Sequence, residues 1–277
     1  MSDETLEYQQ PKSVGLIGLG NMGWWMALNL HKSLDKSKRF FIYDIVPDVL
    51  ETYLEKARTL DVCDVTVYCS TIDPATSLRV GEAIRSKSSS ARFYDAPVSG
   101  GVTGAEAGTL TILAGASEAD IYFQNVVKPL LLTMGRTVVC VGARGHGLVA
   151  KLCNNYLSGI CAIATSEAMN IGMRHGIDAK LLSDIFNKST GANWQNANFN
   201  PVPGVCPNAP PSKGYQGGFK VQMMVKDFNL AIQAAGEVEA KLALGDAALA
   251  AYVATSEDPK CRNLDNRVVY RWLGGRE

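Results

Sequence analysis

Apolar and polar positions divide the 277-residue chain into two parts with different periodicity. In the first part, short apolar runs of strand length alternate with longer segments whose apolar residues recur every three or four positions. Strands are predicted at 13–17, 39–44, 65–69, 91–101, 109–115 and 137–142. Helices are predicted from the end of the first strand through about residue 31, and at 47–58, 74–86 and 118–134. This alternation predicts a mostly parallel, doubly wound α/β sheet with helices on both faces.

After Gly147 the strand patterns end and helical patterns continue alone. A long helix rich in small residues is predicted from Leu148 to about His175, and further helices at 181–187, 219–235 and 240–255. The irregular segment Pro201–Gly218, with five Pro and four Gly, is either disordered or a functional loop. We therefore expect an α/β domain at 1–145 and an all-helical domain at 146–277 that begins with the long helix.

Composition and charge narrow the functional classes. An apolar fraction of 47% and a charged fraction of 19% are typical of a soluble globular protein. A net charge of zero gives no electrostatic footprint for nucleic acid or an anionic membrane. The seven scattered Cys predict reduced packing residues, and with three His no metal site is expected. The first twelve residues hold three acids and no Arg, which predicts neither a secretory signal nor a transit peptide.

A glycine-rich turn joins the first predicted strand to the first predicted helix. It consists of Gly18, Leu19, Gly20, Asn21, Met22 and Gly23. In this pattern the first glycine permits a tight turn, the second lets backbone approach a pyrophosphate, and the third allows close strand–helix packing. GxGxxG alone is a weak signal, but here it lies between a strand and a helix. We therefore expect a Rossmann-like dinucleotide-binding domain.

Asp44 ends the second predicted strand, 21 residues after Gly23. In dinucleotide folds a carboxylate at this place accepts hydrogen bonds from the adenosine ribose hydroxyls and repels a 2′-phosphate. NAD is therefore favoured over NADP. The alternative is that Asp44 only caps the following helix.

Lys151 and Asn155 lie one turn apart on one face of the long predicted helix. A lysine in a closed site could exchange a proton with a reacting hydroxyl, and burial would lower its pKa toward the neutrality that this role requires. By itself, a helix lysine is more often a solvated surface charge.

Seven segments, in this order, carry a resemblance to a known family: GLIGLGNMGWWMALNL, STIDPATS, DAPVSGGVTGAEAGTLTILAG, GHGLVAKLCNN, NPVPGV, YQGGF and VKDFNLA. Together they resemble the β-hydroxyacid dehydrogenase family, in particular its branch that oxidises 3-hydroxyisobutyrate. The resemblance covers the chain from Val14 to about Gly245. It implies NAD-dependent oxidation of 3-hydroxyisobutyrate to methylmalonate semialdehyde in valine catabolism, a small hydroxy-acid substrate, and a homo-oligomer formed through the helical domain.

The resemblance also implies residue roles. Lys151 resembles the catalytic lysine, which accepts the hydroxyl proton while C3 of the substrate passes hydride to NAD⁺. Asn155 resembles its partner, which hydrogen-bonds the substrate hydroxyl. The substrate carboxylate would be held by Ser99, Gly100 and Gly101, which otherwise make an ordinary turn. Thr71 and Lys226 resemble cofactor-binding residues, Lys226 reaching the cofactor across the domain interface. The alternative role of Thr71 is helix capping, which Asp73 fills more naturally. The alternative role of Lys226 is a surface ion pair.

The chain is shorter than this family's pattern between Asp44 and Ser70. About two βα units, on the order of 40 residues, are absent, including the strand that normally lies beside the first strand. Either the segment Val65–Cys69 takes that place or the domain does not close properly. We hypothesise a shortened form of an active dehydrogenase, from splicing or a mis-joined gene.

Two alternative functions remain open. One is a related semialdehyde or glyoxylate reductase, and the other is a catalytically impaired protein that binds only dinucleotide or partner subunits. The family implies a mitochondrial location, with the cytoplasm as the alternative because no presequence is visible.

Overall fold

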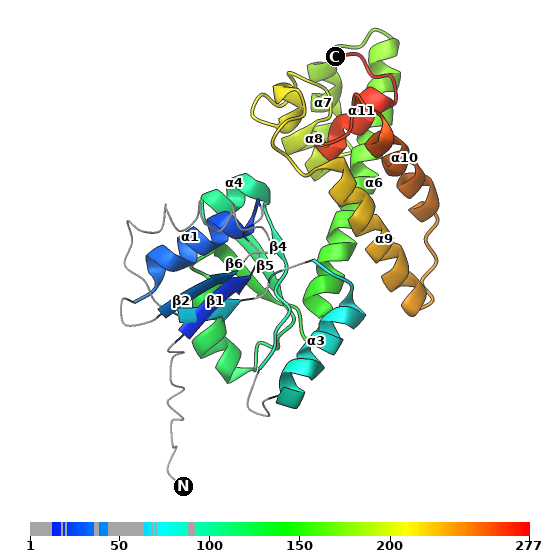
Figure 1. Ribbon diagram of the computed structural model, residues 1–277. Helices are drawn as coiled ribbons and strands as arrows, with labels where there is room; N and C mark the ends of the chain where they lie inside the picture. Colours follow the sequence, from blue (N-terminus) through cyan, green and yellow to red (C-terminus); the bar gives the residue numbers. More distant parts are fainter. Residues whose placement is uncertain are drawn as a thin grey trace. The chain divides into compact units, whose positions relative to one another are not determined.

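The computed structural model describes residues 13–17, 19, 21–35, 39–43, 64–67, 69, 71–87 and 92–277 (Figure 1). Its internal contacts divide the chain into two compact units, Met1–Lys151 and Leu152–Glu277. The first unit combines strands and helices, and the second is helical. The helix predicted at 47–58 lies outside the described residues.

The first unit contains a parallel sheet in which β1 is the central strand. β1 (Ser13–Ile17) pairs with β2 (Arg39–Tyr43) on one side and with β3 (Asp64–Val67) on the other. Helix α1 (Gly23–Ser33) buries Met26, Ala27 and Leu30 in the core that also holds Val14 and Leu16 of β1. β3 therefore takes the place beside the first strand that the shortened sequence left open.

A second sheet has the order β4-β5-β6. β4 (Val98–Ser99) runs antiparallel to β5 (Leu110–Ala114), which is parallel to β6 (Gly135–Cys140). Helix α4 (Gly101–Glu106) links β4 to β5, and a π-helix (Phe123–Val127) followed by α5 (Lys128–Leu131) links β5 to β6. Leu110 and Ile112 share one core with β1 and α1, although no backbone pairing joins the two sheets within the described ranges.

The strand predicted at 91–101 is largely wrong. Residues 92–97 lie outside any strand, and only Val98 and Ser99 pair, in antiparallel orientation. The N–H groups of Leu113 and Gly115 donate to the carbonyl oxygens of Pro97 and Asp95, at 2.9 and 2.8 Å. Pro97 has no N–H to return such a bond, so the ladder is one-sided there.

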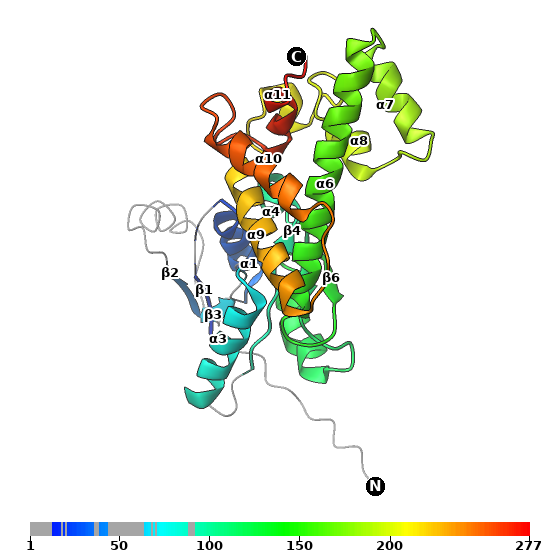
Figure 2. The ribbon, with the colours of Figure 1, turned by 90° about the vertical axis from the view of Figure 1, so that its right-hand side faces the viewer.

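The second unit is built around the long helix α6 (His146–Arg174), which begins in the first unit. The longer helices that follow are α7 (Ala179–Asn187), α9 (Val221–Glu237) and α10 (Gly245–Glu257). Two short helices, α8 (Trp194–Phe199) and α11 (Val269–Trp272), were not predicted. Figures 1 and 2 show α9 and α10 along α6, where Phe228 and Tyr252 are fully buried against Tyr156 and Ile160.

The proline-rich segment Pro201–Gly218 is folded against the helices. It contains a short 3₁₀ turn, Pro210–Lys213, and a fully buried Tyr215 whose hydroxyl donates to the Pro201 carbonyl at 2.9 Å. Of the two alternatives for this segment, disorder is therefore excluded.

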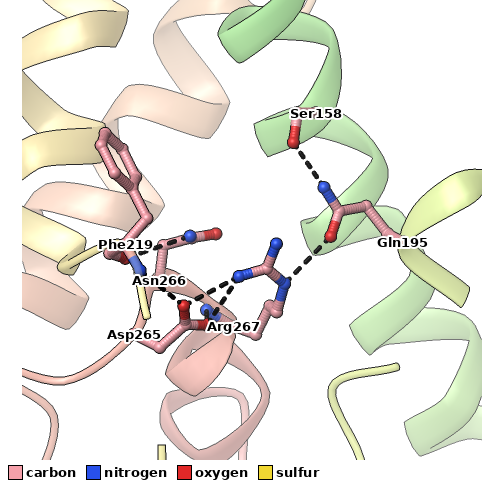
Figure 3. A network of polar contacts seen from close by, with 6 residues as sticks. All are labelled: Ser158, Gln195, Phe219, Asp265, Asn266 and Arg267. Carbon is pink, nitrogen blue, oxygen red and sulfur yellow. Dashed lines mark hydrogen bonds and ion pairs between the residues drawn. The ribbon is translucent and has the colours of Figure 1, made fainter. Parts of the chain in front are cut away.

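A buried polar network ties the end of the chain to this unit (Figure 3). Arg267 Nη1 lies 2.8 Å from Asp265 Oδ2, and its Nε donates to Gln195 Oε1 at 3.0 Å. Gln195 in turn donates to Ser158 of α6. Asp265 also accepts the Phe219 N–H at 2.9 Å, just before α9 begins. The network fixes α6, α8 and the start of α9 to the 3₁₀ turn at Asn266–Val268.

The described residues contain neither a membrane-spanning helix nor a metal-binding cluster. None of the described helices is long and apolar enough to cross a membrane. Within the same part of the chain, no group of three or more His, Cys, Asp or Glu side chains is placed to hold a metal ion.

Candidate functional site

The glycine-rich turn leads from β1 into α1 as predicted. Leu19 is buried, and α1 begins at Gly23 without a side-chain cap at Met22 or an acid in its first turn. Such a helix start suits an anion, because the helix dipole is positive there and no carboxylate repels it. Gly18, Gly20 and Asp44 lie outside the described residues.

Lys151 is buried, with 9% of its surface exposed, on the first part of α6. Its Nζ donates to the hydroxyl of Thr71 at 2.5 Å, a residue 80 positions earlier in the chain. Thr71 lies in the loop between β3 and α3 (Pro74–Lys87). The surface-charge interpretation of Lys151 is therefore wrong: this amine is inside the first unit and held by a neighbouring loop.

Asp73 caps α3, as the sequence indicated. The Thr76 N–H donates to Asp73 Oδ1 at 2.7 Å, and this bond lowers the pKa of the Asp73 carboxyl. The capping role that was the alternative for Thr71 thus belongs to Asp73. Nearby, burial raises the pKa of the Cys69 thiol to about 12, against the opposing effect of the Lys151 charge. Cys69 therefore stays protonated at neutral pH and is a packing residue.

Ser99 is the last residue of β4, Gly101 is the first residue of α4, and Gly100 joins them. Gly100 and Gly101 have φ angles of 134° and 68°, a backbone region that favours glycine. A Cβ at Gly100 would also lie 3.1 Å from Leu110 Cδ2. Ser99 is half-buried, whereas the two glycines are exposed. In the described part of the chain, no hydrogen bond joins this turn to Lys151.

In the second unit, Asn155 and Lys226 meet at a buried carboxylate. Asn155 Nδ2 donates to Asp227 Oδ2 at 2.6 Å, and Lys226 Nζ lies 3.0 Å from Asp227 Oδ1. The second contact is an ion pair without hydrogen-bond geometry, since Oδ1 has no hydrogen-bond partner among the described residues. Asp227 is 2% exposed. The alternative for Lys226 was a surface ion pair; an ion pair is present, but its acid is buried.

Asp227 is the residue that sequence reasoning missed. It lies inside the VKDFNLA segment, next to Lys226, and occupies a buried position of α9. A carboxylate on the buried face of a helix needs a partner, and this was a signal that could have singled it out.

A cavity of about 220 Å³ lies where β5 and β6 end, lined among others by Arg92, Tyr94 and Asp120. It contains none of the predicted site residues. Asp120 there accepts the Tyr94 hydroxyl at 2.7 Å, so its polar groups bind one another.

Two family models match the chain. Residues 145–273 match a model described as the NAD-binding domain of NADP-dependent 3-hydroxyisobutyrate dehydrogenase. Residues 44–142 match the NAD-binding domain of 6-phosphogluconate dehydrogenase. The two matches together cover most of the chain.

Named relatives agree with these models. The chain is 39% identical to a probable mitochondrial 3-hydroxyisobutyrate dehydrogenase of Dictyostelium discoideum, over 95% of this chain and 91% of that protein. It is 36% identical to the mitochondrial 3-hydroxyisobutyrate dehydrogenase of Drosophila melanogaster, covering 94% and 88%. The structure of the Mycobacterium tuberculosis 3-hydroxyisobutyrate dehydrogenase with L-serine superposes with a TM-score of 0.80 at 28% identity, covering 94% and 98%.

The Dictyostelium match spans more positions than this chain contributes residues to it. It runs over 303 positions, whereas 95% of 277 residues is about 263, so about 40 aligned positions have no residue in this chain. This equals the length predicted to be absent. With these identities over nearly its whole length, the chain belongs to the 3-hydroxyisobutyrate dehydrogenase family.

Proposed function

We propose that this protein oxidises 3-hydroxyisobutyrate to methylmalonate semialdehyde with NAD⁺. The observation that carries the proposal is the buried amine of Lys151, held 2.5 Å from the Thr71 hydroxyl, in a chain of this family. A buried, positioned amine is suited to general acid–base catalysis on a hydroxyl group.

NAD would be held by the turn from Gly18 to Gly23, with Asp44 on the adenosine ribose and Thr71 and Lys226 as further contacts. The uncapped start of α1, without an acid in its first turn, fits a pyrophosphate. When bound, NAD⁺ supplies the hydride acceptor.

The substrate carboxylate would be held by Ser99, Gly100 and Gly101. One hydroxyl and two backbone N–H groups suit an anion without a full positive charge. The positive φ angles of both glycines explain why glycine occupies these positions, because a side chain at either one would strain the turn.

Lys151 would accept the proton of the substrate hydroxyl, and Asn155, one turn further along α6, would hydrogen-bond that hydroxyl. Asp227 fixes the orientation of the Asn155 amide, because only its NH₂ group can donate to a carboxylate. The other N–H of Asn155 is then directed away from Asp227, where it can serve the substrate.

The wider setting of this function is part of the same proposal. Residues 1–145 would be the NAD-binding domain, and residues 146–277 the substrate and oligomerisation domain of a homo-oligomer. The boundary between the two matched models, at 142 and 145, supports this division. Relatives named as mitochondrial support a mitochondrial location.

A second candidate is an impaired variant that binds dinucleotide or partner subunits without turnover. The specific observation in its favour is that about 40 positions of the 303-position Dictyostelium match, of which this chain supplies about 263, have no residue here. A related semialdehyde or glyoxylate reductase would share the Lys151 chemistry and differ in substrate.

A steady-state assay with NAD⁺ and 3-hydroxyisobutyrate tests the proposal. Lys151→Ala should lower kcat by about 10² to 10⁴-fold, because the proton acceptor is lost. Lys180→Ala, at an exposed position of α7, is the matched control and should leave kcat unchanged. Equal activity of both variants would contradict the assignment of Lys151.

Two further measurements separate the alternatives. In the first, glyoxylate and tartronate semialdehyde are assayed as substrates for reduction with NADH. A kcat/KM for either of them above that for 3-hydroxyisobutyrate would identify a reductase. A thermal shift with NAD⁺ but no turnover of any substrate would support the impaired variant.

A further inference from the structure

The buried carboxylate of Asp95 has no role in the chemistry described above, yet it lies at the start of the helix that carries Lys151. Asp95 is 3% exposed, in the extended segment before β4. Its Oδ1 accepts the Gly145 N–H at 2.7 Å, and its Oδ2 accepts the Leu148 N–H at 3.0 Å. Both oxygens thus accept hydrogen bonds from the backbone at the beginning of α6. The two donor residues follow Asp95 by 50 and 53 positions in the chain.

Two glycines leave room for this carboxylate. A Cβ at Gly115, just after β5, would lie 2.0 Å from Asp95 Oδ1. A Cβ at Gly147, in the first turn of α6, would lie 2.8 Å from Oδ2 and 2.2 Å from the Leu113 carbonyl oxygen. The end of β5 and the start of α6 therefore both pack directly against Asp95.

This arrangement sets the position of Lys151. Lys151 follows Leu148 by three residues, so the two lie on the same side of α6, within one helical turn. The partner of Lys151 is Thr71, from a separate loop of the same unit. The 2.5 Å Nζ–Oγ1 contact requires the start of α6 to be seated correctly against the sheet.

The charge of Asp95 suits this place. A carboxylate near a helix N-terminus interacts favourably with the helix dipole, and charge-assisted bonds to N–H groups are stronger than neutral ones. Asparagine at the same position would turn an N–H group toward an N–H donor and lose one of the two bonds.

We propose that Asp95 is a positioning residue for Lys151: it anchors the first turn of α6 and thereby holds the amine against Thr71. The functional consequence rests on the proposed role of Lys151 as proton acceptor, whereas the anchoring itself does not. Loss of Asp95 should therefore release the Lys151 amine and lower turnover, without removing a group that touches the substrate.

Two readouts in the full-length protein test this. The first is the rate of Lys151 acylation by acetic anhydride, followed by mass spectrometry and divided by the rate at Lys128 of the same unit. Asp95→Asn should raise this ratio about tenfold, because the amine loses its fixed position. The second readout is kcat, which should fall about 10²-fold in Asp95→Asn. This is the loss expected when a catalytic group is displaced by about 1 Å. In a Lys151→Ala background, Asp95→Asn should cause no further loss, because coupled residues are not additive.

Asp178→Asn is the matched control. Asp178 caps α7 by accepting the Leu181 N–H at 2.9 Å and holds no predicted site residue. An unchanged Lys151 acylation ratio in Asp95→Asn, as in the control, would overturn the proposal. If Asp95→Asn raises the ratio but the unsubstituted protein turns over no substrate, the anchoring is supported and the proposed function is refuted. If Asp95→Asn does not fold, Gly147→Ala disturbs the same contact and is judged by the same ratio.

Discussion

At the scale of single residues, the candidate site depends on side chains that are held by contacts with residues distant in the chain. Lys151 is held by Thr71, and Asn155 by Asp227. A buried amide next to a carboxylate has only one favourable orientation, since its oxygen would be repelled. Asp227 thus determines which atoms Asn155 presents, although the contact joins residues 72 positions apart in the chain.

Replacement of Asp227 by Asn should therefore lower kcat for 3-hydroxyisobutyrate by about 10 to 100-fold, because the Asn155 amide can rotate and misplaced groups lose catalytic alignment. The exposed Asp184→Asn variant of α7 is the control. Steady-state kinetics of both variants check this prediction, and an Asp227→Asn enzyme with control-level kcat would contradict it.

At the scale of elements, α3 begins at a carboxylate that positions the loop carrying Thr71. The bond from the Thr76 N–H lowers the pKa of Asp73 in the folded state. A carboxyl with a lowered folded pKa stabilises the protein above its unfolded pKa, and this contribution is lost as the pH falls through the folded pKa.

Asp73→Ala should accordingly reduce the free energy of unfolding by about 1 kcal/mol at pH 7, the usual effect of losing an N-cap. The difference from the unchanged protein should shrink below about pH 4, where the unfolded carboxyl is protonated. Urea unfolding at a series of pH values measures this, and a difference that does not depend on pH would argue against the cap.

The network around Arg267 acts on the same scale, because it joins α6, α8 and the start of α9 (Figure 3). Arg267→Met should lower the free energy of unfolding by about 3 to 5 kcal/mol, since it leaves the Asp265 carboxylate buried and unpaired. The double variant Asp265→Asn/Arg267→Met should lose less than the sum of the two single changes. Denaturant unfolding, with the exposed Arg262→Met as control, measures both effects.

At the scale of the whole molecule, the main departure from the family is the shortened dinucleotide-binding unit. β3 lies directly beside β1, in the place that a further strand occupies in the full 3-2-1-4-5-6 order. The unit thereby keeps a paired central strand, and we hypothesise that the βα units whose loops normally lie near the cofactor are absent from it.

The missing segment can be inserted between β2 and β3 from the Dictyostelium relative. This insertion should tighten NAD⁺ binding and raise turnover, each by about tenfold or more. A tenfold change requires only about 1.4 kcal/mol of recovered contacts. Isothermal titration with NAD⁺ and the steady-state assay compare the two forms. Comparable affinity and turnover in both would refute the hypothesis that the shortening impairs the enzyme.

Local periodicity was enough to predict most of the elements, because strand and helix patterns depend on neighbouring residues. The family was indicated by the resemblance of seven short segments, the glycine-rich turn among them. The sequence by itself also singled out Lys151 and Asn155 as candidates, the glycine-rich turn between β1 and α1, and the short spacing before STIDP. Tertiary structure alone decided which strand closes against β1, and that Pro97 limits the pairing of β4 to two residues. It likewise decided that Lys151 contacts Thr71, that Asn155 contacts Asp227, and that the backbone at the start of α6 contacts Asp95. The residues of these pairs are 80, 72 and 50 positions apart in the chain. The physical reason is that buried polar groups must find partners wherever the packed chain brings them, and no local pattern records that choice.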